Sequence, residues 1–371
     1  MAHRRRCHDV GVTLPTSSGD YAVETRGLVK RFGRTVALAG IDLAIPSGCV
    51  FGVIGPNGAG KTTLMRLLLD IIRPTSGEIR VLGVSPRAGG PELRSRIGFL
   101  PGELHLQSGL TARRLLDDFA SISGPVEPGR IDELAETLGL DLDERVRRLS
   151  KGNKQKLSLI QAFMHRPRLL VLDEPTSGLD PLVQQQFQAM AREATAAGQT
   201  IFLSSHVLSE VQDAADSVAI LRQGSVVKTA TVAELRQSAV RHARIVTTGL
   251  SETAVAQRVA GIPGVGALDT RRLPAGAELG PVIECRATIA GAVGPFVAAV
   301  AELPLQDLVI EEPNLEEAVL TLYSETETDT NSASDSDSDS DPDPDPDSDS
   351  DAHPGPETGT ETTSPGRAGH A

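Results

Sequence analysis

Short apolar runs alternate with segments of helical periodicity from residue 21 to about residue 235. Runs of this kind predict strands, and they occupy residues 21–29, 41–45, 49–54, 97–100, 169–172, 201–203 and 218–221. A helix is predicted from Lys61, because apolar residues recur at helical spacing up to Ile71, ahead of a turn at residues 74–77. Strands that alternate with helices favour an α/β core built on a mainly parallel sheet.

Two further regions have patterns of their own. Residues 111–149 have helical periodicity that is interrupted at Gly124-Pro125. From about residue 244 the pattern predicts strands at 244–248, 265–271, 281–289 and 306–311, and helices at 251–260 and 292–302. This βαββαβ order is typical of a small ferredoxin-like α+β domain. A last helix is predicted from Asn314, because Asn314 and Glu317 are spaced as an N-cap and its reciprocal partner.

The net negative charge of the chain is confined to its last residues. Residues 324–371 contain fourteen acidic residues and one basic residue, whereas residues 1–323 contain 35 of each. A segment in which Asp alternates with Ser and Pro cannot bury enough apolar surface to fold. We therefore predict a disordered acidic tail at 324–371, as well as a disordered arm at 1–20. The tail is interpreted as a solvated segment, with serine phosphorylation or weak Ca²⁺ binding as alternatives.

Cysteine usage and hydropathy indicate the cellular compartment of the protein and whether it spans a membrane. The three cysteines, Cys7, Cys49 and Cys285, are widely separated and form no CxxC pair, which argues against a disulfide framework or a zinc site and fits the cytosol. The arginines at residues 4–6 are not followed by the apolar run of a secretory signal. No apolar stretch approaches the ~18 residues that a membrane span needs, so any span must come from a partner.

A glycine-rich segment carries the strongest chemical signal in the chain. Gly55-Pro56-Asn57-Gly58-Ala59-Gly60-Lys61-Thr62-Thr63 fits the phosphate-loop pattern GxxxxGK[ST], between a predicted strand and a predicted helix. Glycines let the backbone N–H groups turn towards a phosphate. Lys61 is expected to reach the β- and γ-phosphates of ATP, and the Thr62 hydroxyl to bind Mg²⁺. The alternative is a glycine-rich turn that only caps a helix.

Two consecutive carboxylates follow an apolar strand. Asp173 and Glu174 come directly after the run 169–172 and are expected at the carboxyl edge of the sheet, where ligands of α/β proteins bind. Asp173 is predicted to hold Mg²⁺, and Glu174 to polarise the attacking water. Alternatively, both are solvated acids at the end of a strand.

Residues 21–235 resemble the ATP-binding cassette (ABC) ATPases. The resemblance rests on five ordered motifs: the phosphate loop, the signature-like segment Leu149-Ser150-Lys151-Gly152-Asn153, the strand with Asp173 and Glu174, the D-loop-like Ser177-Gly178-Leu179-Asp180, and the switch-like His206. Phe32 lies where the family places an aromatic residue that stacks on adenine, although it could belong to the core. The implied domains are an ATP-binding domain at 21–240 with a helical subdomain at about 103–160, a small domain at 241–323 and the tail.

The resemblance implies a mechanism that needs two copies of the cassette. Two domains, in a homodimer or a heterodimer, pair head to tail and enclose two ATP molecules. Ser150 would bind the γ-phosphate in the other subunit through its hydroxyl, and Gly152 through its N–H. His206 would contact the γ-phosphate and the partner's D-loop. Without the other motifs, His206 would be interpreted as an ordinary histidine at the end of a strand.

The sequence departs from the family's pattern at two motifs. The glutamine of the family's Q-loop falls on Gly102, which has no side chain to bind Mg²⁺, although the neighbouring Glu103 could reach the site. This change predicts slow hydrolysis or altered coupling to a partner. In the signature, Lys151 replaces the first glycine and adds positive charge near a phosphate, while Asn153 replaces the glutamine.

The resemblance predicts an ATPase subunit that powers a separate membrane permease. Residues 312–320 resemble the ending of ATPases that serve ABC-2-type exporters, so export is favoured over import. The protein would lie in the cytoplasm, on the inner face of the membrane. The alternative is an ABC ATPase that acts on ribosomes or DNA, which would need a basic nucleic-acid face that the charge balance of residues 1–323 does not predict. The small domain is interpreted as a dimer-contact or regulatory module, or as a stabilising appendage.

Overall fold

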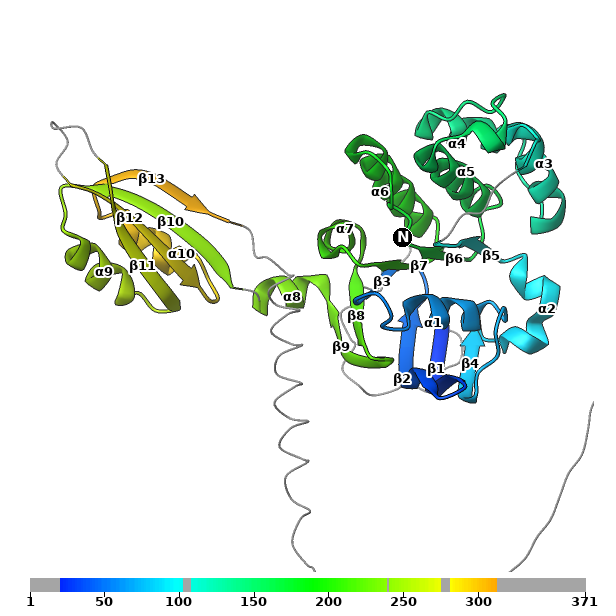
Figure 1. Cartoon of the computed structure of the whole chain (residues 1–371), viewed down its shortest axis with the longest axis horizontal. Coiled ribbons are helices and arrows are strands. Elements are labelled where there is room, and N and C mark those ends of the chain that lie inside the picture. The colour runs from blue at the N-terminus through cyan, green and yellow to red at the C-terminus, as the bar shows by residue number, and fades with distance from the viewer. Residues whose placement is uncertain (1–20, 103–107, 239, 275–280, 312–371) are drawn as a thin grey trace, which may run out of the picture. The chain divides into compact units, whose positions relative to one another are not determined.

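The computed structural model describes residues 21–102, 108–238, 240–274 and 281–311. These residues form a larger α/β domain and a small α+β domain (Figure 1). The predicted N-terminal arm, Glu103, the helix expected from Asn314 and the acidic tail lie outside the described residues.

A six-stranded sheet forms the centre of the larger domain, and its strand order is β5-β6-β7-β3-β8-β9. The strands are β3 (Val50–Ile54), β5 (Ile97–Leu100), β6 (Leu169–Asp173), β7 (Thr200–Ser205), β8 (Ser217–Arg222) and β9 (Ser225–Thr231). All neighbours pair in parallel except β8 and β9. Strand β6 is buried on both faces: Leu169 and Val171 enter one core, and Leu170 and Leu172 enter the other. The predicted parallel α/β core is confirmed.

The first of these cores lies between the central sheet and a three-stranded antiparallel sheet of order β2-β1-β4. Its strands are β1 (Tyr21–Phe32), β2 (Thr35–Pro46) and β4 (Ser76–Val81), and helix α1 (Lys61–Leu68) packs against both sheets (Figure 1). The prediction that the apolar spacing extends this helix to Ile71 was wrong. Asp70 adopts a left-handed conformation with φ 56°, which a helix does not tolerate but Asp accepts, so the helix stops before Ile71.

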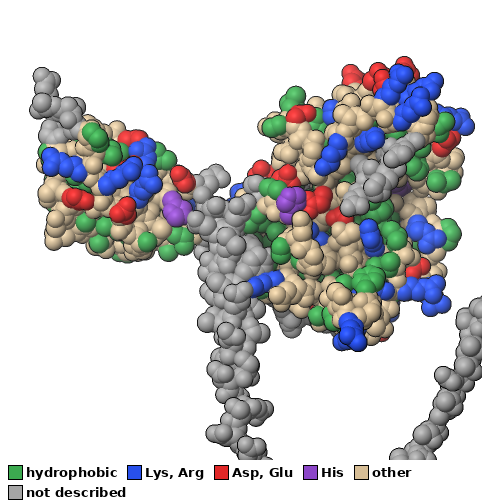
Figure 2. All heavy atoms as spheres, viewed as in Figure 1, with side chains coloured by type: hydrophobic (Ala, Val, Ile, Leu, Met, Phe, Trp, Pro, Cys, Tyr) green, Lys and Arg blue, Asp and Glu red, His purple; other side chains and the backbone are tan. Residues whose placement is uncertain are grey.

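Helices cover the second core on the opposite face of the central sheet. They include α3 (Ala112–Ser123), α4 (Arg130–Leu138), α5 (Lys151–Phe163) and α6 (Pro181–Ala196). The predicted interruption at Gly124 is confirmed, but residues 139–149 are not α-helical as predicted. Gly139, with φ 60°, ends α4 as a left-handed C-cap, and only a 3₁₀ turn follows at Val146–Arg148. Basic and acidic side chains intermingle over α3 and α4 (Figure 2).

The described part of the larger domain also contains four short helices. They are α2 (Pro86–Arg94), η1 (Val146–Arg148), α7 (Leu208–Ala214) and α8 (Val232–Ser238). Within the described ranges, no helix is both long and apolar enough to cross a membrane.

The small domain has the element order βαββαβ that the sequence predicts. Its elements are β10 (Arg241–Thr248), α9 (Glu252–Ala260), β11 (Val265–Leu273), β12 (Val282–Ile289), α10 (Gly294–Val300) and β13 (Leu305–Ile310). The antiparallel sheet has the order β11-β12-β10-β13, with the two central strands first and third along the domain, as in a ferredoxin-like fold. Alternate residues of β10 and β12, such as Ile245 and Cys285, pack with Val255 and Phe296 of the two helices in one core.

Candidate active site

The glycine-rich loop joins β3 to α1, and its backbone geometry requires glycine at a key position. Gly60 caps the helix with φ 109°, a conformation that other residues rarely adopt. A Cβ atom at Gly60 would lie 2.7 Å from the carbonyl oxygen of Ala37. The loop therefore passes close to β2, and α1 begins directly at Lys61. Its first N–H groups have no partner within the helix, and this favours an anion at that end.

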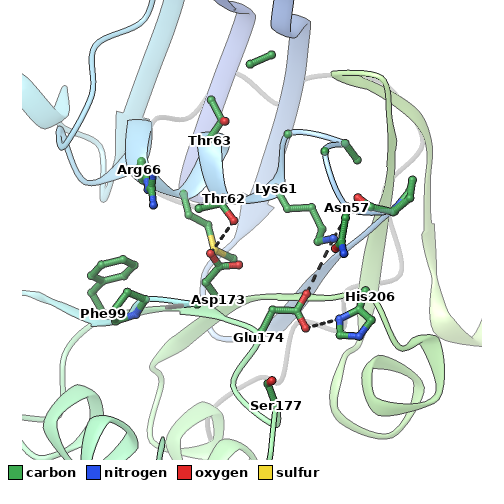
Figure 3. Close-up of a pocket in the computed structure, with 18 residues that line it drawn as sticks. Asn57, Lys61, Thr62, Thr63, Arg66, Phe99, Asp173, Glu174, Ser177 and His206 are labelled. Atoms are coloured by element: carbon green, nitrogen blue, oxygen red, sulfur yellow. Dashed lines mark hydrogen bonds and ion pairs between the residues drawn. The ribbon is translucent and has the colours of Figure 1, made fainter. Parts of the chain in front are cut away.

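A cavity of about 440 Å³ lies over this loop (Figure 3). Eight of the nine residues of the predicted phosphate loop line it, together with Asp173, Glu174 and His206. The lining also includes Ala37, Met65, Arg66, Phe99, Pro101, Gly102 and Ser177. The folded chain thus brings together residues that are more than a hundred positions apart in the sequence.

Lys61 lines this cavity, and its side chain is buried. Its ammonium donates a hydrogen bond to the carbonyl of Gly55 at 2.5 Å and lies 4.0 Å from Oε1 of Glu174. Burial lowers the pKa of the Lys61 ammonium, while the carboxylates of Glu174 and Asp173 act in the opposite direction. Because its charge is buried, the ammonium of Lys61 would be stabilised strongly by a polyanion that enters the cavity.

Asp173 and Thr62 form a pair of oxygen donors at the carboxyl end of β6. The Thr62 hydroxyl donates to Oδ2 of Asp173 at 2.8 Å, and the Ser204 hydroxyl of β7 donates to Oδ1 at 2.5 Å. Asp173 and Ser204 are partners in the parallel pairing of β6 and β7. A hydroxyl and a carboxylate held together beside a phosphate loop are the donor types that Mg²⁺ takes in such sites.

The carboxylate of Glu174 lies between two other predicted site residues (Figure 3). Its Oε2 is 2.6 Å from Nδ1 of His206, and its Oε1 faces Lys61. The backbone of Glu174 is left-handed, with φ 54°, and its N–H is held by Ser204. Glu174 and His206 lie at the ends of neighbouring parallel strands, which is why they meet at the edge of the sheet.

Besides Gly55 of the loop, three predicted residues do not line this cavity as the described residues define it. The Phe32 ring is 50% exposed, so it is not a core residue, and it lies 4.8 Å from the ammonium of Lys30. Ser150 caps α5, since its Oγ accepts the N–H of Asn153 at 3.2 Å. A Cβ at Gly152 would lie 3.0 Å from the carbonyl oxygen of Gly178. The signature-like segment is therefore next to the D-loop-like segment of the same chain.

Gly102 lines the cavity, at the position where the family's pattern has a glutamine. A Cβ at this position would lie 3.0 Å from Oδ2 of Asp173. The backbone of residue 102 therefore approaches Asp173 more closely than a side chain would comfortably permit.

Several residues that the sequence does not predict hold the site together rather than line it. Ser204 contacts both Asp173 and Glu174, and Gln155 binds the backbone of Glu174. Glu210 accepts hydrogen bonds from Thr176 at 2.5 Å and from Ser205 at 3.1 Å. The pairing of β6 with β7 places Ser204 beside Asp173, and no spacing along the chain indicates that pairing.

A phosphate loop that opens a helix, beside a buried parallel strand that ends in two carboxylates, defines a P-loop nucleoside triphosphatase. The sequence model of the ABC transporter family matches residues 38–177. The bacitracin transport ATP-binding protein BcrA of Enterococcus faecalis is 35% identical over 221 residues, which are 59% of this chain and 72% of BcrA. The chain belongs to the ABC transporter family and is an ATP-binding subunit with the ATPase activity of that family.

Two other proteins extend the comparison. The daunorubicin resistance ATP-binding protein DrrA3 of Streptomyces coeruleorubidus is 32% identical over 309 residues, which are 82% of this chain and 96% of DrrA3. A solved structure of an ATP-binding subunit of an ABC transporter superposes with a TM-score of 0.54 at 28% identity, over 58% of this chain and 92% of that one. These similarities support the transporter prediction over the ribosome or DNA alternative.

Proposed function

We propose that this protein powers the export of a small molecule through a separate membrane permease, on whose cytoplasmic side it acts. The observation that carries the proposal is the assembly of Lys61, Asp173, Glu174 and His206 around one cavity. The direction of transport is supported by relatives named for bacitracin transport and daunorubicin resistance.

In this proposal, the residues of the cavity divide the work of hydrolysis. The loop N–H groups and Lys61 bind the phosphates, and Thr62 with Asp173 would hold Mg²⁺, which neutralises phosphate charge when bound. Glu174 accepts a proton from the attacking water or orients it. His206, 2.6 Å from Glu174, keeps that carboxylate in place and approaches the γ-phosphate. Phe32 offers an exposed ring to adenine.

The cavity is completed by a second cassette. Ser150 and Gly152 are absent from the described lining of the cavity, and both lie where a helix N-terminus can face the γ-phosphate bound by another subunit. We infer that two copies of this chain, or this chain and a related one, enclose two ATP molecules. The small domain is proposed as a contact or regulatory module, and no nucleic acid is proposed as a partner.

The test is co-expression with a permease, followed by purification and reconstitution in vesicles. We expect ATP-dependent transport with the wild-type chain and a loss of at least about tenfold with Lys61→Ala, because the phosphates lose their buried cation. Lys228→Ala, at an exposed position of β9, is the matched control and should transport normally. Normal transport by Lys61→Ala would contradict the proposal.

A further inference from the structure

Gln155 of α5 connects the signature-like segment to the backbone of Glu174. The helix begins at Lys151, directly after Ser150, and Gln155 lies just over one turn further along. The Gln155 side chain is 4% exposed, and its amide nitrogen donates to the carbonyl oxygens of Glu174 and Pro175, each at 3.0 Å. Both donors of this amide are therefore used within a buried contact.

The contact matters because Glu174 has an unusual backbone conformation. Its φ of 54° is left-handed, which is unfavourable for a residue with a Cβ and persists only when the surroundings impose it. On one side, Ser204 holds the N–H of Glu174 through its carbonyl at 3.3 Å and its hydroxyl at 3.1 Å. On the other side, Gln155 holds the carbonyl group. The two residues fix Glu174 from opposite ends.

This conformation also determines where the Glu174 carboxylate points. The carboxylate lies between Lys61 and His206 in the cavity, and both contacts depend on how the backbone presents the side chain (Figure 3). If the amide of Gln155 is removed, two carbonyl groups lose a buried hydrogen-bond donor. The backbone at 174–175 is then expected to leave its present conformation. Gln155 itself is not part of the described lining of the cavity, so it does not contact the nucleotide there.

We propose that Gln155 is a positioning residue that couples the helix carrying the signature-like segment to the catalytic carboxylate of the same chain. The inference rests on the proposed function, in which Ser150 serves the ATP of one site and Glu174 that of the other. Gln155 then provides a direct path of two hydrogen bonds between the two sites. A shift of α5 when Ser150 meets the partner's ATP moves the backbone that aims Glu174.

The experiment compares Gln155→Met with the wild-type full-length chain. Methionine has the same length but no donor, so we expect kcat to fall at least about tenfold. The Kd for ATP should stay within about twofold, because the phosphate loop is untouched. Gln161→Met, on the same helix but with no hydrogen bond to residue 174 or 175 among the described contacts, is the matched control and should keep the wild-type kcat.

A second variant makes the result independent of how Gln155→Met folds. Gln155→Glu keeps the shape and places an acceptor against two carbonyl oxygens, so its kcat should fall at least as far with ATP binding intact. A kcat within about twofold of wild type in either folded variant would overturn the inference. Equal losses in kcat and ATP affinity would also overturn it, because they indicate general damage.

Glu174→Gln, measured in parallel, separates this inference from the proposed function. If Glu174→Gln is inactive and Gln155→Met is fully active, only the role of Gln155 fails. If Glu174→Gln hydrolyses ATP normally, the proposed role of the site itself fails.

Discussion

At the scale of single residues, the arrangement around Glu174 makes the sharpest prediction. Glu174→Gln keeps the size of the side chain and removes the negative charge between Lys61 and His206. We expect ATP to bind with at least wild-type affinity, while turnover falls by about 10²-fold or more, the usual value of a general base. Steady-state ATPase assays and equilibrium ATP binding measure the two effects. Glu193→Gln, on the exposed side of α6, is the control, and normal turnover by Glu174→Gln would exclude the assigned role.

Gly102 allows a second test at the same scale. A Cβ there would lie 3.0 Å from Oδ2 of Asp173, so Gly102→Ala should push on that carboxylate and lower the ATPase rate severalfold. Gly102→Gln adds the same Cβ together with an amide that can bind polar groups in the cavity. We therefore expect its basal rate to exceed that of Gly102→Ala. Equal rates for the two variants would show that residue 102 does not take the place of the family's glutamine.

Lys61 and Thr62 show what the sequence can predict at a site. Their spacing within one loop carries the prediction, and the structure places both in the cavity. Ser204 and Gln155 could not be predicted, because each acts through a backbone group that only strand pairing or helix packing brings near. For Phe32, the sequence does not indicate that its ring lies beside Lys30 and outside the described lining of the cavity.

At the scale of secondary-structure elements, buried strands were predicted better than helix ends. Strands β5 and β6 were found because their apolar runs are continuous and buried on both faces. Strand β9 was missed, since most of its residues are at least partly exposed and it lies at the edge of the sheet. Helices α1 and α4 end where Asp70 and Gly139 adopt a left-handed backbone conformation. The spacing of apolar residues does not indicate the backbone conformation of a single residue.

An ionised carboxylate in the sheet of the small domain is expected to make the stability of that domain depend on pH. Glu284 of β12 is 4% exposed, and the hydrogen-bonded Arg271 guanidinium holds the pKa of its carboxyl below the ordinary 4.5, with Arg286 and Arg244 contributing. The charged form is favoured by folding, so its stabilisation is present above pH 4.5 and is lost as the pH falls below that value towards the lower pKa of the folded state.

The variant Glu284→Gln tests the predicted direction of this pH dependence. We expect the melting temperature of the small domain to fall by about 5 °C at pH 7, and the difference from wild type to shrink as the pH is lowered below 4.5. Circular dichroism melts of the full chain at several pH values provide the measurement. Glu302→Gln, exposed in the same domain, should melt like wild type at each pH. An equal loss at acid and neutral pH would exclude a charge-dependent contribution.

At the scale of the whole molecule, the question is whether one chain can complete its own site. The described lining of the cavity contains Lys61 but neither Ser150 nor Gly152. A head-to-tail pair places Lys61 of one chain opposite Ser150 of the other, so that each site needs both chains. If this is correct, two different inactive variants can restore one site between them.

Mixing Lys61→Ala with Ser150→Ala tests that arrangement. Each variant alone should be inactive, because both of its sites lack one group. In a mixed dimer, the intact loop of the Ser150→Ala chain meets the intact signature of the Lys61→Ala chain, and one of the two sites is complete. With random exchange before ATP is added, we expect up to about a quarter of the wild-type ATPase activity. Removing the Ser150 cap also costs α5 about 1 kcal/mol, so retained ATP binding by Ser150→Ala must confirm its fold. An inactive mixture of two folded variants would mean that the signature acts on the ATP of its own chain.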